Sequence, residues 1–487
     1  MPLPLWTLPF KEPHTEIKLI NGSYYKYQIS YLYDPAKKHT VKKSGPILGK
    51  ITEQGFVPSP KHLLRQELLN PAADIKTYGI FALFSLLLRD EIPSLQETLG
   101  RPLADMLLSF AMFRWAYQSP IKRASLYHAH HFSAEFWATD RALTDKAVSG
   151  ALQSIGENRG LVMTWLKLLL PESAARESFL LMDSTHVMSA SERLEVNAKG
   201  YNNSFDFGKQ IRLMYLFSAT MKLPVYYRLL GGNIVDVAAM DLCVKEMGVS
   251  DVVYIADKGF YSTGNVAMLE QRNLKYIMPV RRSNPAIHYG PIGDGEFKIK
   301  NRRFIWQGRV IWYYQYEASG LQFATYLDDR LRVEEEQDYL TRIRTHPDTY
   351  TEEGYQERLR RFGTVTLVYR MSGTPAPDEV YMAYKQRNEI EMMFDSYKTF
   401  MKADVSYMQN RYVLEGWLFT NFIAMMAYYK LYGKLREAKL LGTYSPQDII
   451  EMSKAVYKVR IRGTWYLAEV TAKVRKLLIK AGIDYLN

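Results

Sequence analysis

The chain has 487 residues, 47% of them hydrophobic, with one cysteine and a formal net charge of +12. Its length exceeds what a single hydrophobic core usually organises, so we expect two to four domains. One cysteine, Cys243, excludes an internal disulfide framework, and the positive charge favours a polyanionic partner.

Residues 1–60 are predicted to form a small basic segment of β or irregular structure. The tyrosine-rich stretch SYYKYQISYLY is followed by Lys37, Lys38, Lys42 and Lys43. Tyrosines interleaved with lysines can stack on and neutralise nucleic acid, but a solvated hairpin is the simpler interpretation. Since no basic stretch leads into an apolar one near the start, we expect no signal peptide and a cytoplasmic protein.

Residues 61–170 show helical periodicity, for example in YGIFALFSLLL and ADMLLSFAMFRWAY, and are predicted to form a helical domain. Thr144 or Asp145 is a candidate cap for a helix through residues 147–155. This spacing is compatible with a DNA-reading helix pair that exposes Lys146 and Ser149, although helix pairs are also common in bundles. The histidine group His128, His130 and His131 is predicted to lie at a surface or helix end rather than to bind metal.

Residues 171–284 are predicted to alternate as three strands, a helix, a strand, a helix and a strand. That order resembles the ribonuclease H-like fold, in which a mixed sheet gathers its acidic residues at one end. Two short apolar runs end at acidic residues, FLLM at Asp183 and VVYIA at Asp257. We expect each aspartate to lie where a strand gives way to a loop, a position that suits catalysis but also turn formation.

Residues 285–363 show alternating patches such as RFIWQGRVIWYYQYEA and are predicted to be a β-rich insertion. Residues 364–410 would complete the core with the strand TVTLVYR and one long helix from Asp378 to Phe400. Residues 411–487 are predicted to be helical, and the apolar run from Leu414 to Tyr429 is too short and too interrupted for a membrane span. The predicted class is therefore mixed α/β, with helical regions on both sides of the core.

The predicted long helix carries Tyr384, Arg387, Glu391 and Lys398 at offsets 0, 3, 7 and 14, which places them on one helical face. A carboxylate flanked by cations suits metal-assisted phosphodiester chemistry, although such a stripe is also typical of a solvated face. Three carboxylates without clustered histidines or cysteines favour Mg²⁺ or Mn²⁺ over zinc. DNA cleavage is the leading hypothesis.

Asp183, Asp257 and Glu391, with the pattern Y-x2-R-x3-E-x6-K, resemble the catalytic set of DDE transposases of the insertion-sequence-four type. The segments KGYNNSFDFGKQIRLMYLFS, GGNIVD (Gly232, Asn233 and Asp236) and ADKGFYSTGNVAMLEQRNLKYIMPVRRS are also family-like. The resemblance covers roughly residues 179–483.

The resemblance implies a cut-and-paste DNA transposase in which Asp183, Asp257 and Glu391 hold two Mg²⁺ or Mn²⁺ ions. It further implies that Tyr384, Arg387 and Lys398 contact the DNA end. The insertion would add Arg302 and Arg303 as phosphate contacts and Trp306 and Trp312 near a flipped or hairpinned nucleotide, although tryptophans on alternating strands usually pack a sheet face.

The implied partners are double-stranded DNA, as terminal inverted repeats and as target, and a second copy of the chain, in a nucleoid-associated protein of a bacterium or archaeon. Two alternatives stay open: a domesticated DNA-binding protein that kept the fold, and a ribonuclease H-like nuclease that only hydrolyses. The acidic triad opposes the first, and the end-recognition pattern opposes the second.

Overall fold

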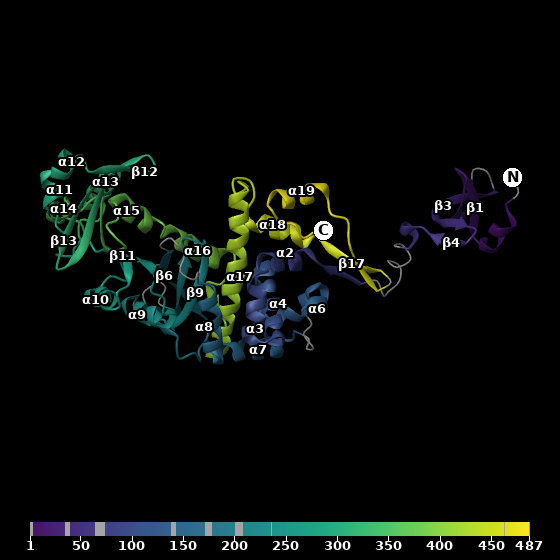
Figure 1. Cartoon of the computed structure of the whole chain (residues 1–487), viewed down its shortest axis with the longest axis horizontal. Helices are drawn as coiled ribbons and strands as arrows, with labels where there is room; N and C mark the ends of the chain where they lie inside the picture. Colours follow the sequence, from purple (N-terminus) through teal and green to yellow (C-terminus); the bar gives the residue numbers. More distant parts are fainter. Residues whose placement is uncertain are drawn as a thin grey trace. The chain divides into compact units, whose positions relative to one another are not determined.

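The computed structural model describes residues 3–34, 39–63, 74–137, 143–170, 178–199, 208–234, 236–461 and 463–486 (Figure 1). The chain divides into two compact units. The first contains residues 1–79 and 454–475, and the second contains residues 80–453 and 476–485. This division pairs an N-terminal segment with a C-terminal one, whereas the sequence analysis divided the chain into six consecutive parts.

The first unit contains a four-stranded antiparallel sheet, β1-β2-β3-β4, and a three-stranded one, β18-β17-β5. Its elements are η1 (Leu5–Phe10), β1 (Thr15–Ile20), β2 (Ser23–Asp34), β3 (His39–Thr52), β4 (Gly55–Pro58), β5 (Asp74–Thr77), β17 (Tyr457–Ile461) and β18 (Thr464–Leu467). The tyrosine-rich stretch forms β2, while Lys37 and Lys38 lie outside the described residues. Part of the predicted C-terminal helical region is thus strand, because apolar and basic residues alternate along β17 with period two.

The second unit begins with a group of helices. These helices are α2 (Gly79–Leu87), α3 (Glu91–Leu99), α4 (Arg101–Tyr117), η2 (Ile121–Arg123), α5 (Ala124–His130), α6 (Ser133–Phe136), α7 (Asp145–Glu157) and α8 (Arg159–Leu168). Thr144 caps α7 by accepting a hydrogen bond from the backbone N–H of Ala147. His128 and His130 lie in the last turn of α5. The neighbouring His131 is buried and 2.9 Å from the Tyr117 hydroxyl, and burial lowers its pKa to about 3.

The long helix α17 (Arg411–Glu437) is largely buried and contacts α4, α7 and the sheet strand β9 (Figure 1). It is followed by α18 (Pro446–Lys454) and α19 (Ala472–Lys480). The buried Arg114 of α4 donates to Asn421 of α17, at 3.0 Å. Within the described ranges, no helix is both long and apolar enough to cross a membrane.

An eleven-stranded mixed sheet is the centre of the second unit. Its main path is β12-β13-β14-β15-β11-β10-β6-β8-β7, with β16 paired to β6 and β9 paired to β8. The strands are β6 (Ser178–Ser189), β7 (Ala198–Lys199), β8 (Lys209–Ser218), β9 (Leu223–Gly231), β10 (Val252–Ala256), β11 (Lys275–Val280), β12 (Arg303–Trp306), β13 (Arg309–Ala318), β14 (Leu321–Asp328), β15 (Thr364–Arg370) and β16 (Val405–Ser406). All five residues of β10 are buried, so both faces of the sheet are covered there.

The strand and helix order of the core follows the predicted order, with the short β7 added. The helices between the strands are α9 (Asp236–Met247) and α10 (Thr263–Gln271). Position 232, in the GGNIVD segment, requires glycine because the backbone of β8 lies close to it. A Cβ at Gly232 would lie 2.1 Å from the carbonyl oxygen of Gln210. The mixed α/β class is confirmed.

The region predicted as a β-rich insertion does not form a separate sheet. β14 pairs with β15, so β12, β13 and β14 extend the core sheet. The same region also contains helices that the alternating pattern did not reveal: α11 (Gly290–Asp294), α12 (Glu296–Ile299), α13 (Asp329–Thr345) and α14 (Glu352–Arg358). Asp328 begins α13 by accepting hydrogen bonds from the backbone N–H groups of Arg330 and Leu331.

The predicted single helix from Asp378 to Phe400 was wrong in one respect, because it is two helices. α15 (Pro377–Lys385) and α16 (Asn388–Thr399) are separated at Gln386 and Arg387. The backbone tightens there into bonds that span three residues, for example from the N–H of Arg387 to the carbonyl of Tyr384 at 3.0 Å. Tyr384 and Glu391 therefore belong to different helices.

Candidate active site

Asp183 and Asp257 are brought together by the register of two parallel strands. β10 pairs with β6 so that its last residue, Ala256, lies opposite Met182, and the residue that follows each of these two is an aspartate. At Asp257 the strand ends in a turn, closed by a 2.9 Å bond from the N–H of Phe260 to the carbonyl of Asp257. The two carboxylates thus occupy equivalent positions on neighbouring strands.

The prediction that a strand ends at Asp183 was wrong. β6 continues to Ser189, and beyond Asp183 it pairs with β8 on one side. What ends at Met182 is the pairing with β10, and that opens the sheet beside Asp183. The aspartate therefore lies at an internal edge of the sheet rather than at a loop.

Glu391 is carried by α16, which an aromatic cluster anchors against β8. The buried side chains of α16 are Ile390, Met393, Phe394 and Tyr397, which follow helical spacing. The fully buried Tyr215 of β8 has its ring centroid 5.9 Å from that of Phe394 and 6.0 Å from that of Tyr397. With this face buried, Glu391 is left on the exposed side of the helix.

Arg387 connects the aspartate pair to Glu391. Its guanidinium lies 3.4 Å from the Asp257 carboxylate and 2.7 Å from that of Glu391, four residues along the chain. Burial alone would lower the pKa of Arg387, but the negative charges of Asp257, Glu391 and Asp183, together with the Tyr384 phenol, raise it above its usual value. The three predicted carboxylates therefore act on one cation.

Tyr384 joins this group from the end of α15. The Arg387 guanidinium lies 5.9 Å from the centre of its ring, and burial raises the pKa of the phenol, so the hydroxyl stays protonated and can donate. Lys398 lies elsewhere on α16. Burial lowers its pKa against the attraction of Asp395 and Asp404, and its charge acts on His186 of β6. The structure thus groups Tyr384 and Arg387 with the carboxylates and gives Lys398 a different set of neighbours.

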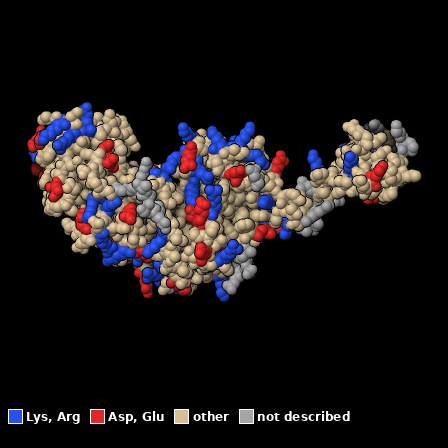
Figure 2. All heavy atoms as spheres, in the orientation of Figure 1, with Lys and Arg blue, Asp and Glu red and all other residues tan. Residues whose placement is uncertain are grey.

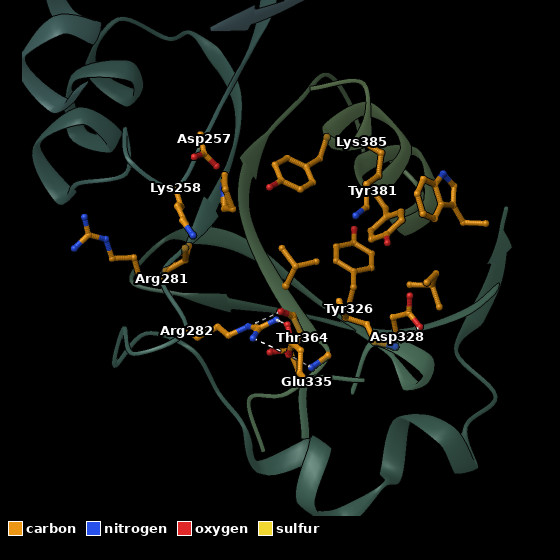
Figure 3. Close-up of a pocket in the computed structure, with 18 of the residues that line it drawn as sticks. Asp257, Lys258, Arg281, Arg282, Tyr326, Asp328, Glu335, Thr364, Tyr381 and Lys385 are labelled. Carbon is orange, nitrogen blue, oxygen red and sulfur yellow. Dashed lines mark hydrogen bonds and ion pairs between the residues drawn. The ribbon is translucent and has the colours of Figure 1, made fainter. Parts of the chain in front are cut away.

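An open cavity of about 730 Å³ is lined by Asp257 and by Trp306, Arg309 and Ile311 of the β12–β13 hairpin; Figure 3 shows Asp257 and Lys258 on one side of it and Tyr326 and Tyr381 on another. Aromatic rings and cations line it together. The aromatic residues are Trp306, Tyr326, Tyr381 and Tyr384, and the cations are Lys258, Arg281, Arg282, Arg309 and Lys385. The Lys385 ammonium lies 5.0 Å from the ring centre of Trp306 and 5.1 Å from that of Tyr381.

Most of these lining residues were missed by the sequence analysis. A signal was present for three of them, because Lys258 directly follows Asp257, Lys385 directly follows Tyr384, and Arg281 directly follows the strand KYIMPV. Arg309 and Tyr381 have no such neighbour in the sequence. They reach the cavity through the hairpin and through α15.

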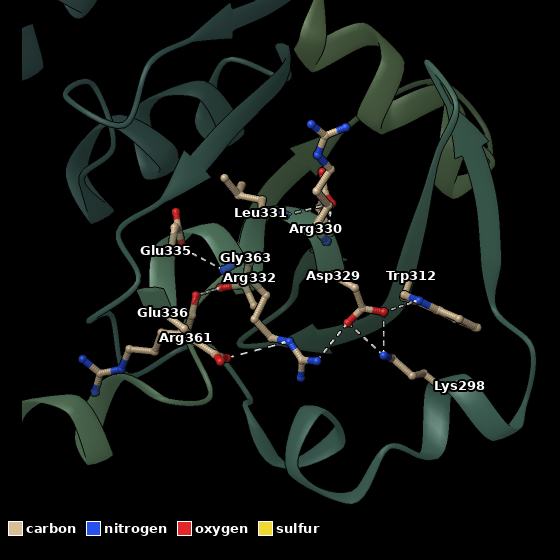
Figure 4. Close-up of polar contacts among 12 residues, drawn as sticks. Lys298, Trp312, Asp329, Arg330, Leu331, Arg332, Glu335, Glu336, Arg361 and Gly363 are labelled. Carbon is tan, nitrogen blue, oxygen red and sulfur yellow. Dashed lines mark hydrogen bonds and ion pairs between the residues drawn. The ribbon is translucent and has the colours of Figure 1, made fainter. Parts of the chain in front are cut away.

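Trp312, the second tryptophan predicted to be near DNA, is held on another side of the insertion (Figure 4). Its indole N–H donates to Asp329 at 2.9 Å, and Lys298 binds the same carboxylate at 2.7 Å. It packs against the buried cluster of Phe297, Tyr314 and Leu327. These contacts support the packing alternative for Trp312, whereas Trp306 lines the cavity.

The predicted basic contacts of the insertion are separate from the carboxylates. Arg303 stacks on Trp312, with 5.7 Å between its guanidinium and the ring centre, and Arg302 lines a smaller cavity of about 200 Å³ beside Tyr314 and Tyr316. Both arginines are exposed. Figure 2 shows other Lys and Arg groups spread over the visible face of the second unit, with Asp and Glu between them.

Lys146 and Ser149 lie on α7, whose buried face packs against α17. Lys146 is exposed and Ser149 is half-buried. The helix is therefore a bundle helix with one exposed side. Its role in reading DNA stays a prediction.

The donor chemistry of the site fits hard cations. The three side chains offer carboxylate oxygens, which suit Mg²⁺ or Mn²⁺. Over the part of the chain that the structure describes, no three Asp, Glu, His or Cys side chains are close enough together to hold a single ion. The structure instead places Asp183 and Asp257 at matching positions of two neighbouring strands, and it brings Asp257 and Glu391 into contact with Arg387.

Comparison with known proteins places this site in a family. A family model described as "Transposase DDE domain" matches residues 174–427, more than half of the chain and a span that contains Asp183, Asp257 and Glu391. No protein with a curated description matches the chain.

Two solved structures show weak likeness. One is a piggyBac transposase synaptic complex with hairpin DNA, at TM-score 0.40 and 12% identity, over 77% of this chain and 79% of that one. The other is a Mos1 transposase paired-end complex with the left transposon end, at TM-score 0.15 and 15% identity, over 33% and 54%. Likeness at this level adds nothing to the assignment, which rests on the family match: the chain belongs to the DDE transposase domain family.

Proposed function

We propose that this protein binds the ends of its own insertion sequence and carries out metal-dependent cut-and-paste transposition. The observation that carries the proposal is the pairing of Arg387 with Asp257 and Glu391, with Asp183 at the matching position of the neighbouring strand, beside an open cavity lined with cations and aromatic rings. The Y-x2-R-x3-E-x6-K pattern supports the insertion-sequence-four type. The sheet order, with a parallel β10–β6 pair next to an antiparallel β6–β8 pair, supports a ribonuclease H-like core.

In this mechanism the carboxylates act as ligands and not as acid or base. Asp183 and Asp257 would hold one ion between them, and Glu391 would complete a second with one of the aspartates. Two bound Mg²⁺ or Mn²⁺ ions would activate water or a DNA 3′-hydroxyl and stabilise the leaving oxygen of an in-line displacement. The parallel register fixes the spacing of the aspartates, and the aromatic anchor of α16 fixes the glutamate.

Other residues of the site would position the DNA. Tyr384 can donate a hydrogen bond to a phosphate, and Arg387 and Lys398 can pair with phosphates. Trp306, which is half-buried, offers a ring on which an unpaired base at the DNA end can stack, in the cavity that Asp257 also lines, and the buried Tyr381 supports that ring from the side. Arg302, Arg303, Lys146 and Ser149 would contribute contacts farther from the carboxylates, and Trp312 would support the hairpin.

The first test uses labelled duplexes copied from the DNA that flanks the gene. These are incubated with Mg²⁺ or Mn²⁺ and either the parent protein, Asp183→Asn or Asp257→Asn, and the products are resolved on a denaturing gel. We expect a discrete cut at the element end with the parent and none with either variant, while both variants still bind the duplex. A matched control is Asp241→Asn on α9, which removes an aspartate paired with Arg272 and Lys245 away from the site.

Each rival function has its own outcome in this assay. Binding without cleavage in either metal would favour a domesticated DNA-binding protein, and scattered cuts without end preference would favour a nuclease. Cleavage by Asp257→Asn at the parent rate would refute the ligand assignment. A strand-joining assay then separates a transposase from a nuclease, because a nuclease yields no joined product.

We also propose that two copies of the chain act on paired ends, in the cytoplasm and associated with the nucleoid. Cut-and-paste transposition needs two ends cut together, which a dimer provides. Light scattering with paired end duplexes tests this, and one protein copy per complex would refute it.

A further inference from the structure

Arg387 occupies the same carboxylate oxygens that the proposed ions would need. Its guanidinium forks between two acids from different elements, Asp257 at the end of β10 and Glu391 on α16. The side chain of Arg387 is 17% exposed and that of Asp257 is 30% exposed, whereas that of Glu391 is 49% exposed, so the contact with Asp257 is the better shielded from water. A single positive charge therefore stands between carboxylates that would otherwise repel each other.

The turn between α15 and α16 is what gives Arg387 this reach. Because residues 386–387 leave the regular helix, Arg387 begins a new helix four residues before Glu391 while it faces the sheet end at Asp257. Tyr384, at the end of α15, closes the other side of the guanidinium. The arginine is thus enclosed by the site and not directed away from it.

We infer that Arg387 is an internal counter-ion, which holds Asp257 and Glu391 together when no metal is bound and which entering ions must displace. The inference rests on the proposed metal-dependent function. Displacement has a second consequence, because the freed guanidinium of Arg387 stays beside the ions. It can there bind a DNA phosphate through two hydrogen bonds. Metal binding and phosphate capture would then be coupled through one side chain.

A merely structural ion pair makes the opposite prediction about metal affinity. If Arg387 served to shape the site, its loss would misplace the ligands and weaken metal binding. If it competes with the ions, its loss leaves the carboxylates without a cation and strengthens metal binding. The two roles therefore differ in sign and not in degree.

The test measures Mn²⁺ binding to the DNA-free full chain by calorimetry and by the electron paramagnetic resonance of free Mn²⁺. We compare the parent with Arg387→Gln, which removes the charge, and with Arg387→Lys, which keeps a charge but cannot fork between two carboxylates. We expect Arg387→Gln to bind Mn²⁺ about tenfold more tightly, as removal of a nearby like charge from a partly shielded site implies. Arg387→Lys should fall between the two.

Two controls locate the effect. Arg272→Gln removes an arginine paired with Asp241 at 3.0 Å, away from the site, and should leave Mn²⁺ affinity unchanged. Asp257→Asn added to Arg387→Gln should abolish the gain. Thermal unfolding gives a readout that does not depend on activity: Mn²⁺ should raise the melting temperature of Arg387→Gln more than that of the parent.

Equal or weaker Mn²⁺ binding by Arg387→Gln would overturn the inference, and if the parent still cuts the element end with metal, the proposed function stands. Absence of Mn²⁺ binding in both proteins would overturn the inference and the metal-dependent mechanism together. A further arm adds a pre-cleaved end duplex. The phosphates of this duplex can ligate Mn²⁺ in both proteins, so some tightening of Mn²⁺ binding is expected in both. The coupling through Arg387 is the extra tightening that the duplex produces in the parent, and Arg387→Gln should lack it.

Discussion

Gly416 on α17 should tolerate no side chain, because two helices touch through their backbones at this point. A Cβ on Gly416 would lie 2.1 Å from the carbonyl oxygen of Leu152 on α7. The contact is reciprocal, since a Cβ on Gly156 of α7 would lie 2.0 Å from the carbonyl oxygen of Tyr412 on α17. Backbone atoms cannot turn aside as the end of a flexible side chain can.

The cost of Gly416→Ala follows from this geometry. A carbon and an oxygen need more than about 3 Å, so the helices must part locally by about 1 Å, which weakens the dispersion contacts along their interface. Overpacking of this kind costs about 3 kcal/mol, and the better helix propensity of alanine returns about 1 kcal/mol. We expect a net loss of about 2 kcal/mol in the free energy of unfolding.

Gly433→Ala is the matched control, with the same chemical change on the same helix. A Cβ at Gly433 meets nothing within 4 Å, so the propensity gain stands alone and should stabilise the protein by up to about 1 kcal/mol. Urea unfolding of both variants and the parent provides the measurement. If Gly416→Ala proved as stable as Gly433→Ala, the close approach of α7 and α17 would be disproved.

Three further predictions concern other parts of the second unit. Burial lowers the pKa of His131 to about 3 in the folded state, whereas in the unfolded chain the imidazole takes up a proton below about pH 6.5. The free energy of unfolding should therefore fall by about 1.4 kcal/mol per pH unit as the pH drops from 6.5 towards 3. His131→Phe should remove this pH dependence in urea unfolding, and His130→Gln should keep it. Glu335 accepts hydrogen bonds from Arg282 at 2.9 and 3.0 Å and from the backbone N–H of Gly363 at 2.7 Å, so Glu335→Gln should destabilise the insertion by about 1–2 kcal/mol, seen as faster hydrogen exchange in β14 and α13 but not in α4. Trp312→Ala loses a hydrogen bond and packing on the buried cluster and should cost about 3 kcal/mol in urea unfolding, whereas Trp306→Ala loses contacts with Tyr381 and Lys385 only and should cost less and reduce cleavage at the element end; the reverse pattern would contradict their placement.

The order of strands and helices in the core was predictable because each element has a clear local sequence pattern. Apolar runs of strand length alternate with helical periods from residue 178 to residue 280, and the structure follows them. The matching positions of Asp183 and Asp257 on two neighbouring strands have no such local pattern. β6 continues through Asp183, and only its partner strand β10 ends there. Pairing register is a long-range property, so Asp183 was found for the wrong local reason, whereas Asp257 does follow the end of its strand as predicted.

The interruption between α15 and α16 was hidden for a different reason. Residues 377–399 keep helical spacing across Gln386 and Arg387, since one turn of three-residue bonds shifts the phase too little to disturb the pattern. The helix α13 was missed because it is almost entirely polar and has one buried residue, Tyr339, so it shows no apolar stripe. Period-based reasoning detects elements with a buried face and misses those without one.

The way α16 is fixed bears on which group would move under the proposed metal binding. Its buried face packs on Tyr215, and just beyond its end Arg114 donates to the carbonyl of Met401 at 2.8 Å from within the helical layer. Asp183 is fixed by its pairing with Tyr215 of β8, and Asp257 is fixed between the last paired residue of β10 and the turn bond from Phe260. Since the backbones of all three carboxylates are held by buried contacts, a change in bound charge must be accommodated by side chains, and Arg387 has the longest of those at the centre. Anchored carboxylates around one long cationic side chain are the arrangement that the proposed coupling of metal binding and phosphate capture requires.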